Sequence, residues 1–342
     1  MIKEYSYGTI TLYKDKNGRV EILVVKWAWY RWFPKWHIEE GETPVEAAVR
    51  ELQEEAWIKK VKVDETKIFK DHYIFTQKKK IISKHVWYFI AYVANKKVVM
   101  DKRELSAYRR VSLPDARNLL TFDSAKGILD SVLDHLGYEK YLLTALPDDL
   151  SLTLLNSLKQ YFYAYGFRYE NKKSTSDVHI TLAQILCAPS QLQSVYLRLK
   201  STLKYFESFP LSCNKIINKL HKLDTISKRY PNGVSRVALS FDDVRLKRIA
   251  REVISVCKIL WVDDTASYVQ RIRDSRLKRS LHSDYIKYIA NHMNICNYAK
   301  SEKAQEIVRL STQRIPTMMS IDKVALRNFN GRNEWIIQLK NK

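Results

Sequence analysis

Residues 36–58 read Trp-His-Ile-Glu-Glu-Gly-Glu-Thr-Pro-Val-Glu-Ala-Ala-Val-Arg-Glu-Leu-Gln-Glu-Glu-Ala-Trp-Ile, and this stretch decides the fold of the first part of the chain. Thr43 and Glu46 have the spacing of a capping box, and Pro44 suits the first helical position, so we expect a helix to begin here. Apolar residues then recur at helical spacing, which predicts one buried side. They are Val45, Ala48, Val49, Leu52 and Ala56.

Three carboxylates share another side of this helix. Glu51, Glu54 and Glu55 are spaced i, i+3 and i+4, which brings them together on one face. Carboxylates held this close repel one another unless a cation lies among them, and Mg2+ or Mn2+ prefers such oxygen ligands. A solvated acidic face is the usual interpretation of such a cluster, but the spacing of the longer motif favours a metal site.

The stretch resembles the Nudix box. That pattern is a glycine, five residues, a glutamate, seven residues, and then Arg-Glu-aliphatic-X-Glu-Glu-X-Gly-aliphatic. The residues in register are Glu42, Arg50, Glu51, Leu52, Glu54, Glu55 and Ile58, while Trp36 and Trp57 stand at the two glycine positions. The resemblance implies an α/β/α sandwich with a mixed sheet, and a hydrolase of phosphoanhydrides that uses Mg2+ (or Mn2+).

The resemblance also implies roles for single residues. Glu51 and Glu54 would be catalytic and, with Glu55, would bind the metal, while Arg50 orients the glutamates by charge-assisted hydrogen bonds. The backbone at Trp36 would approach the metal. Phe33-Pro34-Lys35-Trp36-His37 is similar to a segment of the diadenosine-tetraphosphate hydrolase branch, which makes Lys35 and His37 candidate substrate contacts.

Residues further along match the same branch. Glu104 stands where that branch has a further carboxylate near the metals, so we assign it as a metal ligand. Tyr88 and Tyr108 are candidates for stacking on a nucleobase, although core packing is the more usual role for both.

The tryptophans of this region need an explanation. Trp32, Trp36 and Trp57 occupy positions where glycine is expected, Trp27 and Trp29 lie close by, and the chain has only 8 glycines in 342 residues. Average proteins contain about 7% glycine. We hypothesise that UGA codons of a lineage that decodes UGA as glycine have been translated as tryptophan. The rival interpretation is an inactive Nudix-like nucleotide sensor in which Trp36 and Trp57 are genuine.

The composition limits the remaining possibilities. A chain of 342 residues is long enough for two domains, and its four cysteines lack the spacing of a zinc site or a disulfide framework. The N-terminus lacks the core of a signal peptide, and no apolar run approaches the ~20 residues of a membrane span. We therefore expect a cytoplasmic protein without a membrane partner. The sequence carries no signal for its oligomeric state.

The positive charge is unevenly distributed. Of the net charge of +22, residues 1–140 carry +6 and residues 141–342 carry +16. A basic domain attracts phosphate polymers, so RNA ends are a possible partner besides a nucleotide substrate. Segments 245–251 and 271–279 are basic and amphipathic, and a solvated helix face is their default interpretation.

We expect two domains, a Nudix hydrolase domain at residues 1–138 and a different unit at residues 139–342. The first has strand-like runs at 5–13 and 20–26 around a turn, and a closing helix from about 124 to 136. Gly137 is a plausible helix cap at the boundary. The fold class is therefore mixed, α/β followed by α+β.

Two short histidine motifs mark the second domain. His179 and Thr181 lie two apart on one expected strand, as do His292 and Asn294 on another, so each pair shares a face. With the strand and helix patterns around them, they resemble the two-histidine phosphoesterases, which include 2′-5′ RNA ligases. The resemblance implies a bilobal α+β fold in which the two histidines act as general base and general acid. Asn294 departs from the family's threonine.

The sequence thus predicts a Nudix hydrolase of a nucleoside diphosphate-linked substrate, such as diadenosine tetraphosphate or an RNA 5′ end. Its second domain would cleave RNA 2′,3′-cyclic phosphates or 2′-5′ linkages. The alternative is a second domain that only binds RNA through its positive charge.

Overall fold

The computed structural model describes most of the chain. The described residues are 1–16, 19–100, 103, 105–164, 178–213, 215–221, 234–266, 289–298, 309, 314–328 and 333–341. The chain divides into two compact units, Met1–Tyr138 and Glu139–Lys342. Within the described ranges, no helix has both the length and the apolar character that a membrane crossing requires.

The N-terminal unit contains a seven-stranded sheet, whose order is β3-β2-β1-β6-β5, with β4 beside β1 and β7 beside β2. Strands β1 and β6 run parallel and the other pairs are antiparallel, so the sheet is mixed. The strands are β1 (Ile2–Lys14), β2 (Val20–Trp27), β3 (Tyr30–Trp32), β4 (Lys35–Trp36), β5 (Val61–Gln77), β6 (Lys80–Val93) and β7 (Ala107–Ser112).

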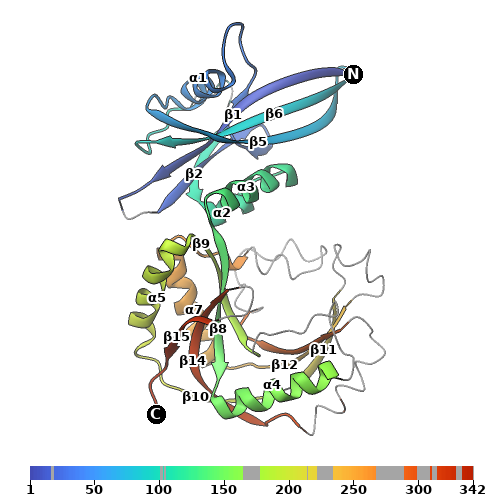
Figure 1. Ribbon diagram of the computed structural model, residues 1–342, viewed down its shortest axis with the longest axis vertical. Helices are drawn as coiled ribbons and strands as arrows, with labels where there is room; N and C mark the ends of the chain where they lie inside the picture. The colour runs from blue at the N-terminus through green and yellow to red at the C-terminus, as the bar shows by residue number, and fades with distance from the viewer. Residues whose placement is uncertain are drawn as a thin grey trace. The chain divides into compact units, whose positions relative to one another are not determined.

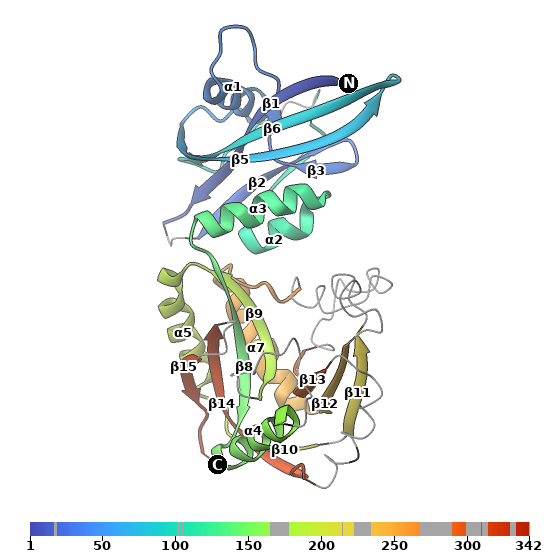
Figure 2. The same cartoon turned by 45° about the vertical axis from the view of Figure 1, so that its right-hand side comes forward.

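Helices cover both faces of this sheet. Helix α1 (Pro44–Ala56) lies on one face, while α2 (Leu113–Leu119) and α3 (Asp123–His135) lie on the other (Figures 1 and 2). Ala47 and Ala48 of α1 pack on Tyr7 of β1 and Phe89 of β6. The N-terminal unit thus has the three layers and the mixed sheet that the sequence predicts.

Gly8 of β1 allows strand β4 to approach β1 closely. A Cβ atom at this position would lie 2.2 Å from the carbonyl oxygen of Pro34 and 2.6 Å from Cβ of Lys35. Only glycine permits so close an approach. It lets the segment that carries Lys35 and Trp36 pair directly with β1.

The C-terminal unit contains an eight-stranded antiparallel sheet, whose order is β10-β14-β8-β9-β13-β12-β11, with β15 beside β14. Its strands are β8 (Glu139–Pro147), β9 (Ile180–Cys187), β10 (Phe209–Ser212), β11 (Lys215–His221), β12 (Val234–Ser240), β13 (His292–Tyr298), β14 (Met318–Asn328) and β15 (Asn333–Gln338). Its helices are α4 (Asp149–Ala164), α5 (Pro189–Leu203) and α7 (Val244–Ile259).

One large apolar core holds this unit together. It joins one side of the central strands to α5 and α7, which pack against each other. Figure 1 shows α5 and α7 together beside β8 and β9. Strands β9 and β13 lie side by side in the middle of the sheet, which brings together the two histidine motifs of the sequence.

Candidate functional site

Helix α1 is held by local interactions at both ends. At its start, Oγ1 of Thr43 accepts a hydrogen bond from the N–H of Glu46, and Oε2 of Glu46 accepts one from the N–H of Thr43 at 2.8 Å. At its end, the N–H of Trp57 donates to the carbonyl oxygen of Gln53. The capping box expected from the sequence is present, and it fixes the helix that carries the carboxylates.

Arg50 gathers the acidic groups around this helix. Its guanidinium donates to both carboxylate oxygens of Glu42, at 2.7 and 3.1 Å, and to Glu51 and Glu54. It also donates to the carbonyl oxygen of His37 at 3.1 Å. The hydrogen bonds that Arg50 donates to Glu42 and Glu51 raise the pKa of Arg50, so the group stays positive. Arg50 therefore connects the loop before α1 to the carboxylates on the helix.

Two of the three carboxylates expected to bind a metal are buried. Glu51 is 2% exposed and Glu55 is 5% exposed, whereas Glu54 is exposed to solvent. Burying two carboxylates one turn apart is costly unless cations compensate them. Arg50 supplies one positive charge to Glu51 and Glu54. The carboxylate oxygens of Glu51, Glu54 and Glu55 are ligands that suit a hard divalent cation.

The carboxylates are not gathered as a metal cluster. In the part of the chain that the structure describes, no three His, Cys, Asp or Glu side chains are grouped so that they could hold a metal ion. Glu51 and Glu54 instead bond to Arg50. Trp36 lies partly buried in β4, next to Tyr7, and Glu104 lies outside the described residues.

Lys35 and His37 lie near Lys84, which is buried in β6, while His37 itself is exposed. Nζ of Lys35 is 3.4 Å from the hydroxyl of Tyr73, and burial, together with repulsion from Lys84, lowers its pKa to about 8. Nε2 of His37 is 3.0 Å from Nζ of Lys84, which also bonds to Glu4 at 3.0 Å. Burial, followed by the charge of Lys84, lowers the pKa of His37.

The sequence reasoning missed Lys84 and Tyr73. Both lie on long strands far from the motif, and Lys84 is 7% exposed inside β6. The only sequence signal for Lys84 was a lysine within a strand pattern that is mostly apolar.

Tyr88 does not suit the stacking role that was one of its two predicted interpretations. It is fully buried, its ring lies edge-on to Phe33, and its hydroxyl accepts a hydrogen bond from Nε1 of Trp32. The burial of this ring agrees with core packing, the role that the sequence favours for Tyr88. Tyr108 is 40% exposed on β7, and its stacking role stays a prediction.

The tryptophans at the expected glycine positions have different environments. Trp57 ends α1 in the left-handed conformation, with φ 53° and ψ 35°, as expected for a position that favours glycine. Trp36 lies against Trp27, with ring centroids 5.3 Å apart, and Trp32 is buried beside Tyr73. Trp57 thus shows the backbone strain that the glycine hypothesis predicts.

The C-terminal unit brings its four motif residues together on one face. Met293 of β13 pairs with Ile180 of β9 in an antiparallel register. Extending this register puts Asn294 opposite His179 and His292 opposite Thr181, and cross-strand partners point to the same face. These four are partly exposed, whereas their neighbours in the sequence face the core. The buried neighbours, each at most 1% exposed, are Ile180, Leu182, Met293 and Ile295.

Each histidine has a hydrogen-bonding partner at Nδ1. Nη1 of Arg327, on β14, lies 3.0 Å from Nδ1 of His179, and Arg327 is 1% exposed. Oδ1 of Asn291 lies 2.7 Å from Nδ1 of His292. Neither partner was identified from the sequence. Arg327 was missed because the β8–β14 pairing that brings it near His179 joins distant segments, whereas Asn291 is adjacent to His292 in the sequence.

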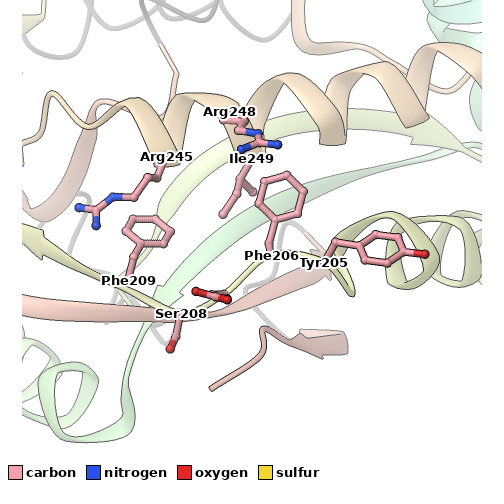
Figure 3. A pocket seen from close by; sticks show the side chains of 8 residues that line it. Tyr205, Phe206, Ser208, Phe209, Arg245, Arg248 and Ile249 are labelled. Carbon is pink, nitrogen blue, oxygen red and sulfur yellow. The ribbon is translucent and has the colours of Figure 1, made fainter. Parts of the chain in front are cut away.

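The basic segment at 245–251 lies in α7, beside a surface pocket of about 330 Å3. Figure 3 shows Arg245 next to Phe209 and Arg248 over Phe206. The guanidinium carbons lie 4.7 and 5.4 Å from the respective ring centroids. Asp243 pairs with Arg245 at 2.6 Å, which offsets part of this charge. The second basic segment, 271–279, lies outside the described residues.

Comparison with known proteins finds similarities for the N-terminal part of the chain. Residues 5–130 match the family described as NUDIX domain. A C. elegans Ap4A hydrolase in a binary complex is similar at 24% identity and a TM-score of 0.34, covering 39% of this chain and 97% of that one. The E. coli dihydroneopterin triphosphate pyrophosphohydrolase is similar at 18% identity and a TM-score of 0.32, covering 38% and 97%.

Proposed function

We propose that this chain is a pyrophosphohydrolase that hydrolyses a nucleoside diphosphate-linked substrate with Mg2+, because residues 5–130 match the NUDIX domain family. The observation that carries this proposal is the acidic side of α1. There, Glu51 and Glu55 are buried one turn apart, and Arg50 links Glu51 and Glu54 to the preceding loop.

The residues of the site have separate tasks in this proposal. Glu51, Glu54 and Glu55 would hold the cation, joined by Glu104 and by the backbone at Trp36. A bound Mg2+ neutralises the charge of a diphosphate and lowers the pKa of a bound water. Arg50 keeps the carboxylates in place, and Lys35 is the candidate contact to substrate phosphate.

The substrate class that we favour is a dinucleoside polyphosphate such as diadenosine tetraphosphate, with an RNA 5′ end as the other candidate. The support is the Phe33-Pro34-Lys35-Trp36-His37 segment, which is similar to that of diadenosine-tetraphosphate hydrolases. Both substrates offer a diphosphate to the same carboxylates. A panel of the two at fixed Mg2+ therefore separates them.

The test compares the full chain with Glu54→Gln and Glu55→Gln in the hydrolysis of diadenosine tetraphosphate. Removing one preorganised electrostatic group from an active site costs on the order of 10²–10³ in kcat, and we expect losses of that size. Glu40→Gln is the matched control, because Glu40 is an exposed carboxylate in the loop before α1. The proposal fails if the α1 variants hydrolyse the substrate as fast as the control.

A second candidate function belongs to the C-terminal unit, which we propose is a phosphodiesterase acting on RNA 2′,3′-cyclic phosphates or 2′-5′ linkages. Its support is the β9–β13 register, in which both histidines, Thr181 and Asn294 share one face of the sheet. Imidazoles on such a face can take and hold protons, and the hydroxyl and amide can bind phosphate oxygens.

The hydrolysis of 2′,3′-cyclic AMP by the full chain tests this second function. A loss of at least tenfold in His292→Gln, with diadenosine tetraphosphate hydrolysis unchanged, would support it. If the parent does not cleave the nucleotide, the alternative is a unit that only binds RNA. The pocket between Phe206, Arg245 and Arg248 is then the surface to test by substitution.

The tryptophan hypothesis has its own test. We propose that codons 36 and 57 are UGA in a lineage that decodes UGA as glycine, and the support is the left-handed backbone at Trp57. UGG at both codons would refute this. It would favour the inactive nucleotide sensor instead.

A further inference from the structure

The two histidines of the C-terminal unit are held by chemically opposite partners. Arginine has only donors, so Arg327 can approach Nδ1 of His179 at 3.0 Å only if that nitrogen carries a lone pair. The amide oxygen of Asn291 has only lone pairs, so Nδ1 of His292 must donate across its 2.7 Å contact.

These contacts fix the state of the other nitrogen on each ring. A neutral imidazole carries one proton, so His179 carries its proton on Nε2, whereas Nε2 of neutral His292 has a lone pair. We propose that Arg327 is a positioning residue that holds His179 as a neutral hydrogen-bond donor. His292 is then the only one of the two whose Nε2 can accept a proton.

Burial of Arg327 makes this restraint strong. The residue is 1% exposed on β14, and its partner strand β8 separates it from β9 in the sheet. A guanidinium held there cannot turn away into solvent. A second proton on Nδ1 of His179 would point at an Arg327 N–H, which is a contact between two donors.

This arrangement changes the roles of the two histidines, an inference that rests on the phosphodiesterase function proposed above. A neutral His179 that lost its Nε2 proton would become an imidazolate, so it suits hydrogen bonding to a phosphate oxygen rather than proton transfer. His292 takes a proton from the attacking water as its oxygen bonds to phosphorus. When the P–O bond to ribose breaks, His292 gives up that proton, which reaches the released oxygen through solvent. The reaction therefore needs only one histidine for proton transfer.

The tautomer can be measured without any substrate. The full chain, labelled with nitrogen-15 in histidine, gives separate ring-nitrogen signals in a long-range proton–nitrogen correlation spectrum at pH 8, and His179→Gln identifies those of His179. We expect a protonated Nε2 and a bare Nδ1 for His179. A proton on Nδ1 of His179 would overturn the proposal whatever the activity of the protein.

Substitution of Arg327 tests the cause. In Arg327→Met we expect a fraction of His179 to move its proton to Nδ1 or to take up a second one. Lys323→Met is the matched control, because Lys323 is a cation on the same strand whose partners are Asp149 and Asp322. An unchanged His179 spectrum in Arg327→Met would refute the positioning role. If Arg327→Met does not fold, Arg327→Lys takes its place with the same expected direction.

Activity on 2′,3′-cyclic AMP separates the two proposals. Glutamine offers an N–H donor but no base, so we expect His179→Gln to lose about tenfold in kcat and His292→Gln about a thousandfold, within the range of general-base catalysis. Equal losses would mean that both histidines carry protons and would overturn the division of roles. If the unsubstituted chain has no activity on 2′,3′-cyclic AMP but shows the expected tautomers, the proposed phosphodiesterase function is refuted and the positioning role of Arg327 is not.

Discussion

Trp57, the left-handed residue at the end of α1, allows a prediction of how substitutions there change the stability of the helix. Trp57 has φ 53°, a conformation that costs a residue with a Cβ about 1 kcal/mol relative to glycine. Substitution by glycine and by alanine removes the same indole, so their difference isolates the Cβ. We predict that Trp57→Gly is more stable than Trp57→Ala by about 1 kcal/mol.

The assay is hydrogen exchange of the full chain, read by mass spectrometry in peptides from α1. A difference of 1 kcal/mol is a factor of about five in the opening equilibrium, so the amides near the end of α1 should exchange about fivefold more slowly in the glycine variant.

Trp29 provides the matched control. It is 70% exposed and is absent from the residues with positive φ, so at that position glycine should be equal to alanine or less stable. If alanine protects α1 as well as glycine at position 57, or if both positions behave alike, the left-handed strain is not the reason that glycine is expected there.

Three further predictions concern the same unit. Gly8→Ala should destabilise the protein by about 1–3 kcal/mol in urea unfolding because its Cβ meets Pro34, whereas Gly127→Ala, in open space on α3, should not; equal stabilities would contradict this. Trp36→Gly should raise kcat for diadenosine tetraphosphate if the indole crowds the metal-binding backbone, and a lower kcat would count against that interpretation. Burial lowers the pKa of Lys35 to about 8, so between pH 8 and 10 the unfolded chain binds more protons than the folded chain. The free energy of unfolding should therefore rise with pH in that window, and the rise should be absent in Lys35→Met.

The local part of the site could be predicted because its interactions span few residues. The capping box joins Thr43 to Glu46, and the bond from Arg50 to Glu54 spans one helical turn. Spacing alone predicts such contacts. The left-handed turn at Trp57 follows from the same local rules.

The remainder depends on strand pairing, which the sequence does not specify. Lys84 meets His37 across 47 positions, and Arg327 meets His179 across 148. Tyr88 alternates in β6 like any strand residue, and it is buried beside Trp32, Phe33 and Gly8, which are far from it in the sequence. The histidine motifs could be found by their local alternation, but their common face required the β9–β13 register.

Metal binding to α1 can be measured before any substrate is chosen. Mn2+ bound to the full chain, counted by electron paramagnetic resonance, should fall at least tenfold in affinity in the Glu51→Gln/Glu55→Gln double variant and stay unchanged in Glu40→Gln. We predict that Mg2+ competes for the same site. Equal Mn2+ binding by the double variant and the parent would contradict the assignment of α1 as the metal-binding helix of a hydrolase.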